Sequence, residues 1–176
     1  MRLFKINRLV VLCVIGMLIS ILVGCASQTT HSKPGTETTI ILTRHAEKTA
    51  ITNDLTEKGR ARAQSLARLL ADKKVTAIFC PDIKRNLDTA EPLAKKMNIQ
   101  ITVVSSTPYP DRVIKAMLSQ HSGGVILWVG NTTNLSDFYS QLGGKGEAPD
   151  NYGDLFIMNI KDQGEPEVVK TRYEAR

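Results

Sequence analysis

Short runs of apolar residues alternate along the chain with longer segments whose apolar residues recur every three or four positions. The short runs predict buried strands, and the longer segments predict amphipathic helices. Strands that alternate with helices favour a mostly parallel sheet with helices on both faces, so we expect a single three-layer α/β/α domain. The expected strands are 38–43, 75–80, 99–104, 125–129, 155–160 and 167–171, and the expected helices lie near 56–70, 83–97, 113–118 and 135–142.

Three of the later strands carry more detailed predictions. Val125–Val129 is apolar throughout, which predicts a central strand covered on both faces. The runs 155–160 and 167–171 are separated by a short polar segment, which predicts an antiparallel hairpin.

The first two helices carry predictions about polar residues. We expect Asp82 to cap the helix over 83–97, because a carboxylate at this position can accept a hydrogen bond from the first helical turn. Arg60, Arg62 and Arg68 are expected on the solvent side of the preceding helix, away from its leucines.

The first 24 residues are typical of a secretory signal. Three basic residues precede an apolar run over 9–23, which is too short for a comfortable membrane span of about 20 residues. The ending Leu22-Val23-Gly24-Cys25 resembles the bacterial lipobox, in which the cysteine is lipidated and becomes the first residue of the mature protein. An ordinary signal peptide or an uncleaved anchor is the alternative.

These features divide the chain into residues 1–24 as a lipoprotein signal peptide, 25–37 as a lipidated Cys25 with a flexible polar tether, and 38–176 as the folded domain. The domain is then expected in the cell envelope, anchored to a membrane through lipid. Ala26 is not the aspartate that often retains lipoproteins at the inner membrane. In a Gram-negative organism, the periplasmic face of the outer membrane is therefore favoured.

Composition excludes several other classes of protein. The net charge of +6 falls to +3 without residues 1–24, and aromatic residues make up 5% of the chain, so a nucleic-acid surface is not expected. Cys13 leaves with the signal and Cys25 takes lipid, which leaves Cys80 as a buried apolar residue without a disulfide or metal cluster. No glycine-rich nucleotide-binding motif is present.

Candidate chemistry begins where the first strand ends, at Arg44-His45. Ligands of open α/β sheets bind at the carboxyl ends of the strands. A guanidinium can grip a phosphate or carboxylate, and its charge favours a neutral, nucleophilic imidazole beside it. The alternative is a structural or solvated histidine, because the dipeptide alone is common.

Three motifs in series resemble the histidine phosphatase superfamily, the phosphoglycerate mutase-like proteins, in a bacterial form with Arg-His-Ala-Glu-Lys. They are Thr43-Arg44-His45-Ala46-Glu47-Lys48, the helix start Leu55-Thr56-Glu57-Lys58-Gly59-Arg60, and the segment from Cys80 to Ala94. The resemblance covers about residues 38–160. It implies that His45 accepts a phosphoryl group, that Arg44 and Arg85 hold the phosphate, and that neither a metal nor another cofactor is needed.

The sequence departs from the family at the fourth strand. Family members usually carry Gly-His there, and this chain has Gly130-Asn131, so Asn131 takes the place of the second histidine as an uncharged phosphate contact. His121 lies at the opposite end of that strand, roughly 16 Å away, and His31 lies on the tether. Loss of one charge-stabilising donor typically lowers a rate by about 10²–10³.

The general acid is the least specific assignment. Asp111 follows the third strand, and Glu47 lies next to the nucleophile, but either carboxylate could instead be solvated. We predict slow hydrolysis of a phosphate monoester, with a phosphorylated small molecule or envelope component as ligand. The alternatives are a phospho-ligand-binding lipoprotein that has lost turnover and a structural lipoprotein with a vestigial pocket.

Overall fold

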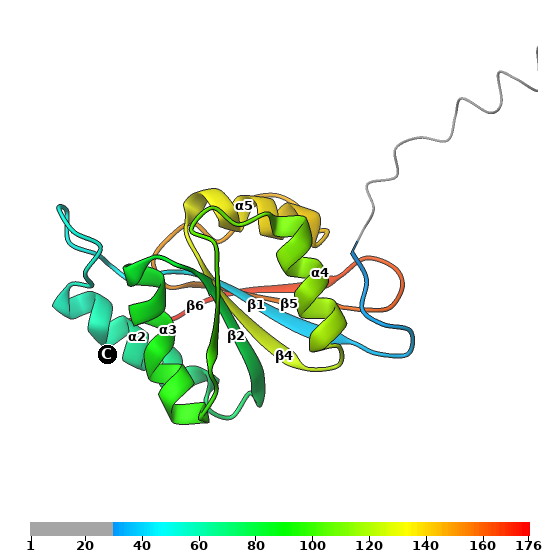
Figure 1. The fold of residues 1–176 in the computed structure, drawn as a ribbon, viewed down its shortest axis with the longest axis horizontal. Helices are drawn as coiled ribbons and strands as arrows, with labels where there is room; N and C mark the ends of the chain where they lie inside the picture. The colour runs from blue at the N-terminus through cyan, green and yellow to red at the C-terminus, as the bar shows by residue number, and fades with distance from the viewer. Residues whose placement is uncertain (1–29) are drawn as a thin grey trace, which may run out of the picture.

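A six-stranded sheet with helices on both faces makes up residues 30–176, the part of the chain that the computed structural model describes (Figure 1). This arrangement confirms the predicted α/β class and the three layers. Its elements are β1 (Thr38–Arg44), α2 (Glu57–Leu70), β2 (Val75–Pro81), α3 (Lys84–Met97), β3 (Ile101–Val104), α4 (Pro110–Gln120), β4 (Val125–Gly130), α5 (Thr132–Gln141), β5 (Asp154–Ile160) and β6 (Glu167–Arg172).

The strand order is β3-β2-β4-β1-β5-β6. The first four strands in this order are parallel, whereas β5 runs antiparallel to β1 and β6 antiparallel to β5, which confirms the predicted hairpin. The carboxyl ends of β1, β2 and β4 therefore meet at one edge of the sheet, where Arg44 pairs in register with Gly130. This edge is where the sequence places the phosphate chemistry.

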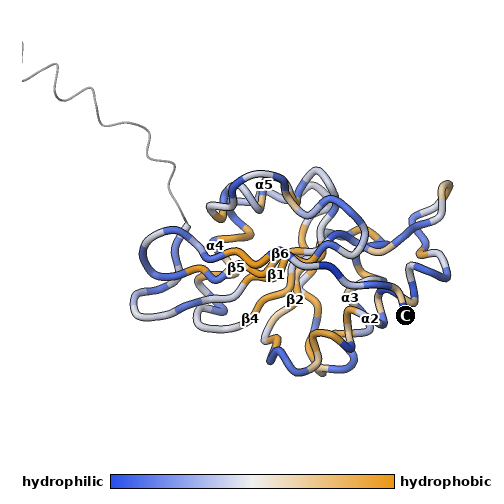
Figure 2. Tube along the Cα trace, turned by 180° about the vertical axis from the view of Figure 1, so that it is seen from behind, coloured by the Kyte–Doolittle hydropathy of each residue, from blue (hydrophilic) through white to orange (hydrophobic). Residues whose placement is uncertain are grey.

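The core has two halves, one on each face of the sheet (Figure 2). Side chains of β4 alternate between them: Ile126 and Trp128 face α4 and α5, and Leu127 and Val129 face α2 and α3. Trp128 also stacks on Phe138 of α5, with ring centroids 4.0 Å apart. The prediction that the fourth strand is central and covered on both faces is confirmed.

Helix α2 begins in contact with the segment that follows β1. Thr56 caps the helix through its side chain, which accepts from the Gly59 amide at 3.0 Å. A Cβ added to Gly59 would lie 2.1 Å from the main-chain oxygen of Glu47. A glycine is therefore needed here, because its missing side chain lets the helix approach the Arg-His segment.

Two predictions about the polar residues of the helices are wrong. Arg62 is buried, at 3% exposed, because it lies on the same helical stripe as Ala63 and Leu66 and pairs with Glu47 beneath the helix. Asp82 is exposed and does not cap α3, whose N-cap is Ile83 without a side-chain hydrogen bond.

Two element boundaries also differ from the sequence-based expectation. Strand β3 begins at Ile101 rather than at residue 99, because Asn98 adopts a left-handed conformation, with φ 54°, that ends α3. Helix α5 begins at Thr132 rather than near Leu135, because Asn131 caps it.

Residues 32–36 are held against the domain, so the expected flexible tether is wrong for this part of it. The Ser32 amide donates to the Lys161 carbonyl at 3.0 Å, and the Ser32 hydroxyl lies 2.6 Å from that of Thr38 and 3.0 Å from that of Ser122. The predicted signal peptide and the Cys25 lipidation site lie outside the described residues. Within 30–176, no helix is long and apolar enough to span a bilayer.

Candidate active site

His45 lies at the carboxyl end of β1, directly beside β4. Its main-chain N–H donates to the Gly130 carbonyl at 2.9 Å, which continues the pairing of the two strands by one residue. The side chain is almost fully buried, at 3% exposed. The imidazole is therefore a fixed part of the sheet edge rather than a mobile surface group.

The hydrogen bonding and the pKa of His45 favour a neutral imidazole with a free Nε2. Nδ1 lies 2.8 Å from the Ala46 carbonyl oxygen, which can only accept, so Nδ1 carries the proton. Burial lowers the pKa of His45 to about 4; the Ala46 hydrogen bond opposes this, and the charges of Arg85, Arg44 and Lys48 lower it further. At neutral pH, Nε2 thus holds a lone pair within a positive field.

Arg44 is oriented by the loop that precedes β5. Its Nη1 donates to the Asp150 carbonyl at 2.7 Å and lies 3.8 Å from the Asp150 carboxylate. Its guanidinium carbon lies 4.5 Å from the centre of the Tyr152 ring. The same ring lies edge-on to the His45 imidazole, with 5.9 Å between the two ring centroids. Arg44 Nε is buried without a hydrogen-bond partner among the described residues, and so can bind an anion.

Arg85 projects from the first turn of α3, which is tied to the nucleophile through Thr89. The Ala46 amide donates to the Thr89 hydroxyl at 2.9 Å, and that hydroxyl donates to the Arg85 carbonyl at 2.7 Å. Asn86 anchors the same turn to β4 by donating to the Val129 carbonyl at 2.9 Å. These bonds make the positions of Arg85 and the His45 backbone interdependent.

The end of the Arg85 side chain contacts a loop for which the sequence predicted no functional role. Nη1 donates to the side-chain oxygen of Asn53, in the loop between β1 and α2. Arg85 Nε, like Arg44 Nε, is a buried donor with no partner within residues 30–176. Two guanidinium groups therefore keep donors available on the same side of the sheet as His45.

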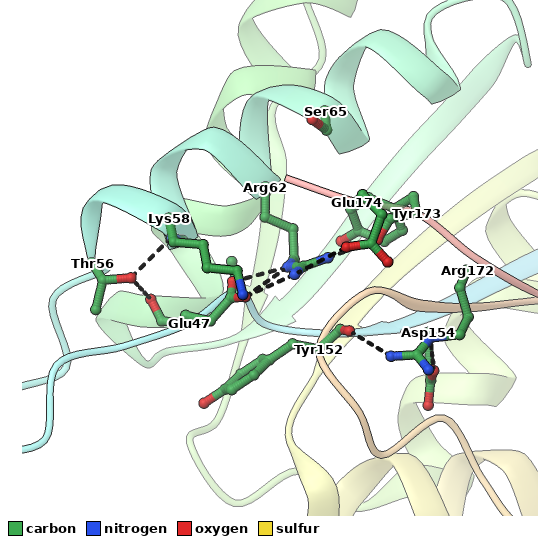
Figure 3. Close-up of polar contacts among 12 residues, drawn as sticks. Glu47, Thr56, Lys58, Arg62, Ser65, Tyr152, Asp154, Arg172, Tyr173 and Glu174 are labelled. Carbon is green, nitrogen blue, oxygen red and sulfur yellow. Dashed lines mark hydrogen bonds and ion pairs between the residues drawn. The ribbon is translucent and has the colours of Figure 1, made fainter. Parts of the chain in front are cut away.

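Glu47 is engaged by Arg62 and is not available as a proton donor (Figure 3). Arg62 Nε donates to both carboxylate oxygens, at 3.1 and 2.9 Å, and Nη2 donates to one of them at 2.8 Å. Burial alone would raise the pKa of Glu47, but the hydrogen bonds and charge of Arg62 outweigh it and hold that pKa below its usual value. Glu47 is thus a carboxylate that fixes the position of Arg62 and of helix α2.

Asn131 is the N-cap of α5. Its side chain accepts from the Asn134 amide at 3.2 Å, and the Asn134 side chain accepts from the Asn131 amide at 2.9 Å. Because Oδ1 is engaged in this reciprocal capping box, the Nδ2 group is the part of the Asn131 amide that remains for a ligand. The sequence signal for this cap is the pair of asparagines spaced as Asn-x-x-Asn, which the sequence analysis did not interpret as a helix start.

The other histidines and Asp111 lie away from this arrangement. His121 caps the carboxyl end of α4 and packs edge-on against Phe79, with centroids 5.6 Å apart, and His31 is exposed. Asp111 is exposed in the first turn of α4, where it makes no hydrogen bond or ion pair with any residue from 30 to 176. The structure thus groups His45, Arg44, Arg85 and Asn131 at one sheet edge, but gives Asp111 no contact with them.

Several residues of the site carried no readable sequence signal. Tyr152 and Asp150 lie in an irregular loop with no motif, and only the fold brings them to Arg44. Arg62 did carry a signal, because it occupies an apolar-stripe position of α2, three residues before Ser65 and four before Leu66. A buried position of this kind requires a partner of opposite charge.

The arrangement is suited to nucleophilic chemistry on an anionic, tetrahedral group. Two guanidinium groups can neutralise charge on phosphoryl oxygens while a neutral imidazole attacks the phosphorus. The described residues contain no group of three or more metal-binding side chains. Burial raises the pKa of Cys80 to about 12, so its thiol is not a competing nucleophile.

Comparison with known proteins agrees with this geometry. Residues 40–106 match the model of the histidine phosphatase superfamily, branch 1. This match supports the predicted resemblance to the superfamily over the first part of the domain. A search of curated protein sequences finds no significant match. The match includes His45, Arg44 and Arg85 and ends before Asn131.

Several solved structures share the fold of this chain. YhfR of Bacillus stearothermophilus has a TM-score of 0.61 at 19% identity, covering 75% of this chain and 95% of its own. The alpha-ribazole phosphatase of Shigella flexneri has a TM-score of 0.60 at 15% identity, with 78% and 97% covered. A mycobacterial glucosyl-3-phosphoglycerate phosphatase with inorganic phosphate has a TM-score of 0.61 at 11% identity, with 78% and 98% covered. At these identities the likeness shows the fold.

The depressed pKa of His45 predicts a pH-dependent stability. Between pH 6.5 and about 4, the unfolded chain protonates this imidazole and the folded protein does not, so the stability falls as the pH falls. From pH 7 to pH 5 we expect the native protein to lose about 2 kcal/mol more unfolding free energy than His45→Gln. Urea denaturation of both proteins at the two pH values measures this difference, and parallel losses would show that His45 titrates normally.

Proposed function

We propose that the domain hydrolyses phosphate monoesters through a phosphohistidine on His45. The lone pair of Nε2 attacks phosphorus, and the ester P–O bond breaks with its electrons going to the leaving oxygen. Water then attacks the phosphohistidine, and the P–N bond breaks with its electrons returning to Nε2. The observation that carries this proposal is the buried His45 imidazole, whose Nδ1 is committed to the Ala46 carbonyl between two arginines with free donors.

Arg44 and Arg85 are assigned to the phosphate. A substrate phosphoryl group would bind their unpaired Nε groups and replace the Asn53 contact of Arg85. The match to the histidine phosphatase model and the presence of phosphatases among the proteins of similar fold support this class of substrate. They do not distinguish one phosphate monoester from another.

Asn131 is expected to slow the reaction. Its Nδ2 can donate one hydrogen bond to a phosphoryl oxygen, but it brings no positive charge to the transition state. The same observation favours a second candidate function, capture of a phosphorylated small molecule or envelope component without turnover, because ligand binding needs less charge stabilisation than catalysis does.

Hydrolysis of 4-nitrophenyl phosphate tests the proposal directly. We expect the full-length protein in detergent to release nitrophenolate, and His45→Ala to lose this activity because no other group in the site can accept the phosphoryl. Acid-labile, base-stable phosphate on the native protein, absent from His45→Ala, identifies the intermediate. Activity that survives in His45→Ala would refute the nucleophile assignment.

Substitutions at Asn131 separate its capping role from its contact with phosphate. Asn131→Asp keeps a good helix cap but replaces the amide donor with a negative charge, so we expect a similar melting temperature and a rate lower by about 10²–10³. Asn131→His restores the family residue at a cost of about 1 kcal/mol of stability, because the cap is lost.

We expect Asn131→His to raise the rate above that of the native protein. A native protein without turnover that becomes active in Asn131→His would favour the binding function instead. A rate unchanged in Asn131→Asp would contradict a contact between residue 131 and the phosphoryl group.

We further infer that Cys25 carries lipid and holds the domain at a membrane of the cell envelope. The support is the sequence Leu22-Val23-Gly24-Cys25 after a basic, apolar leader. We expect Cys25→Ser to move the protein from the membrane fraction and to abolish incorporation of labelled fatty acid. Ser27→Ala is the matched control, and labelling that persists in Cys25→Ser would contradict the anchor.

A further inference from the structure

We propose that Asp150 protonates the leaving oxygen, an inference that rests on the phosphatase function proposed above. Hydrolysis of an alkyl phosphate needs such a donor, because an alkoxide leaves poorly without a proton. The two carboxylates that the sequence offers for this role are unsuitable in the structure. Both oxygens of Glu47 are occupied by hydrogen bonds from Arg62, and Asp111 is exposed on α4 with no contact to Arg44 or Arg85.

Asp150 forms an ion pair with Arg44, one of the two arginines assigned to the phosphate. Its Oδ1 lies 3.8 Å from Arg44 Nη1, and no other carboxylate within residues 30–176 forms an ion pair with Arg44 or Arg85. A phosphoryl group bound by Arg44 would therefore have this carboxyl at its edge, where the ester oxygen can lie.

The backbone fixes Asp150 while leaving its side chain free to turn. The Asp150 carbonyl accepts from Arg44 Nη1 at 2.7 Å, so the residue is anchored independently of its carboxylate. The next residues are also fixed: the Asn151 amide donates to the Asp154 carboxylate at 2.9 Å, and the Tyr152 ring packs on Arg44. The side chain of Asp150 is 58% exposed, which leaves it room to contact a bound leaving group.

The proposed proton transfers balance over the two steps. When His45 Nε2 bonds to phosphorus, the proton of the Asp150 carboxyl moves to the leaving oxygen, and an alcohol departs. In the second step the Asp150 carboxylate takes a proton from the attacking water, whose oxygen bonds to phosphorus as the P–N bond breaks. Inorganic phosphate leaves, and both residues return to their starting states.

The test compares leaving groups in a single turnover, with enzyme in excess over substrate. 4-Nitrophenolate leaves without a proton donor, whereas the alkoxide of glycerol 2-phosphate does not. In Asp150→Asn, which keeps the main-chain anchor, we expect release of glycerol to slow by about 100-fold or more, and release of nitrophenolate by less than about 3-fold. Asp111→Asn is the matched control and should leave both rates unchanged.

Each other outcome overturns the assignment. If Asp150→Asn slows hydrolysis of both substrates equally, Asp150 positions Arg44 and is not the proton donor. If Asp111→Asn slows hydrolysis of glycerol 2-phosphate alone, the proton donor is Asp111 on α4. If Asp150→Asn hydrolyses both substrates at the native rates, Asp150 has no role in the mechanism. In that case the release of nitrophenolate by the native protein would still support the phosphatase proposal. Native protein silent toward both substrates would refute both proposals.

Discussion

The buried ion pair between Glu47 and Arg62 is the interaction on which the site depends most. It connects the turn after β1 to the middle of α2, and Arg62 Nη1 also donates to the Tyr173 carbonyl at 2.6 Å (Figure 3). Loss of one partner from a buried pair typically costs about 3–5 kcal/mol, because the other charge is left uncompensated. The segment that follows His45 is therefore fixed to α2 and to the C-terminal segment.

Asn131 illustrates how stability and catalysis compete at a single position. A good N-cap contributes about 1 kcal/mol to the helix that it begins, whereas a missing charge-stabilising contact raises a reaction barrier by roughly 3–4 kcal/mol. The stability that the cap contributes is thus smaller than the increase in the activation barrier that a missing contact would cause. Asn131→His therefore exchanges a helix cap for the imidazole that the superfamily usually has at this position.

The fold could be predicted from the sequence because apolar runs and helical spacing determine which segments are buried. The proximity of Arg44 and Arg85 to the same end of the sheet could be predicted for the same reason, since both residues follow parallel strands whose carboxyl ends lie together. The contacts of loop residues could not be predicted from the sequence. Asp150 and Asp111 both lie in polar segments without a motif, and their different surroundings arise from tertiary packing. Arg62 and Asp82 were placed wrongly because residue type was weighed above position along the helix.

The segment before β1 joins the domain at the amino end of that strand (Figure 1), and His45 directly follows its carboxyl end. Ser32 and Lys33 are bonded to the connections before β4 and after β5, and the seven residues of β1 then span roughly 20 Å to the reactive edge. A domain held by this end would direct the carboxyl ends of the parallel strands away from the surface of attachment. The proposed site would then be open to the surrounding compartment rather than to the surface that holds the chain.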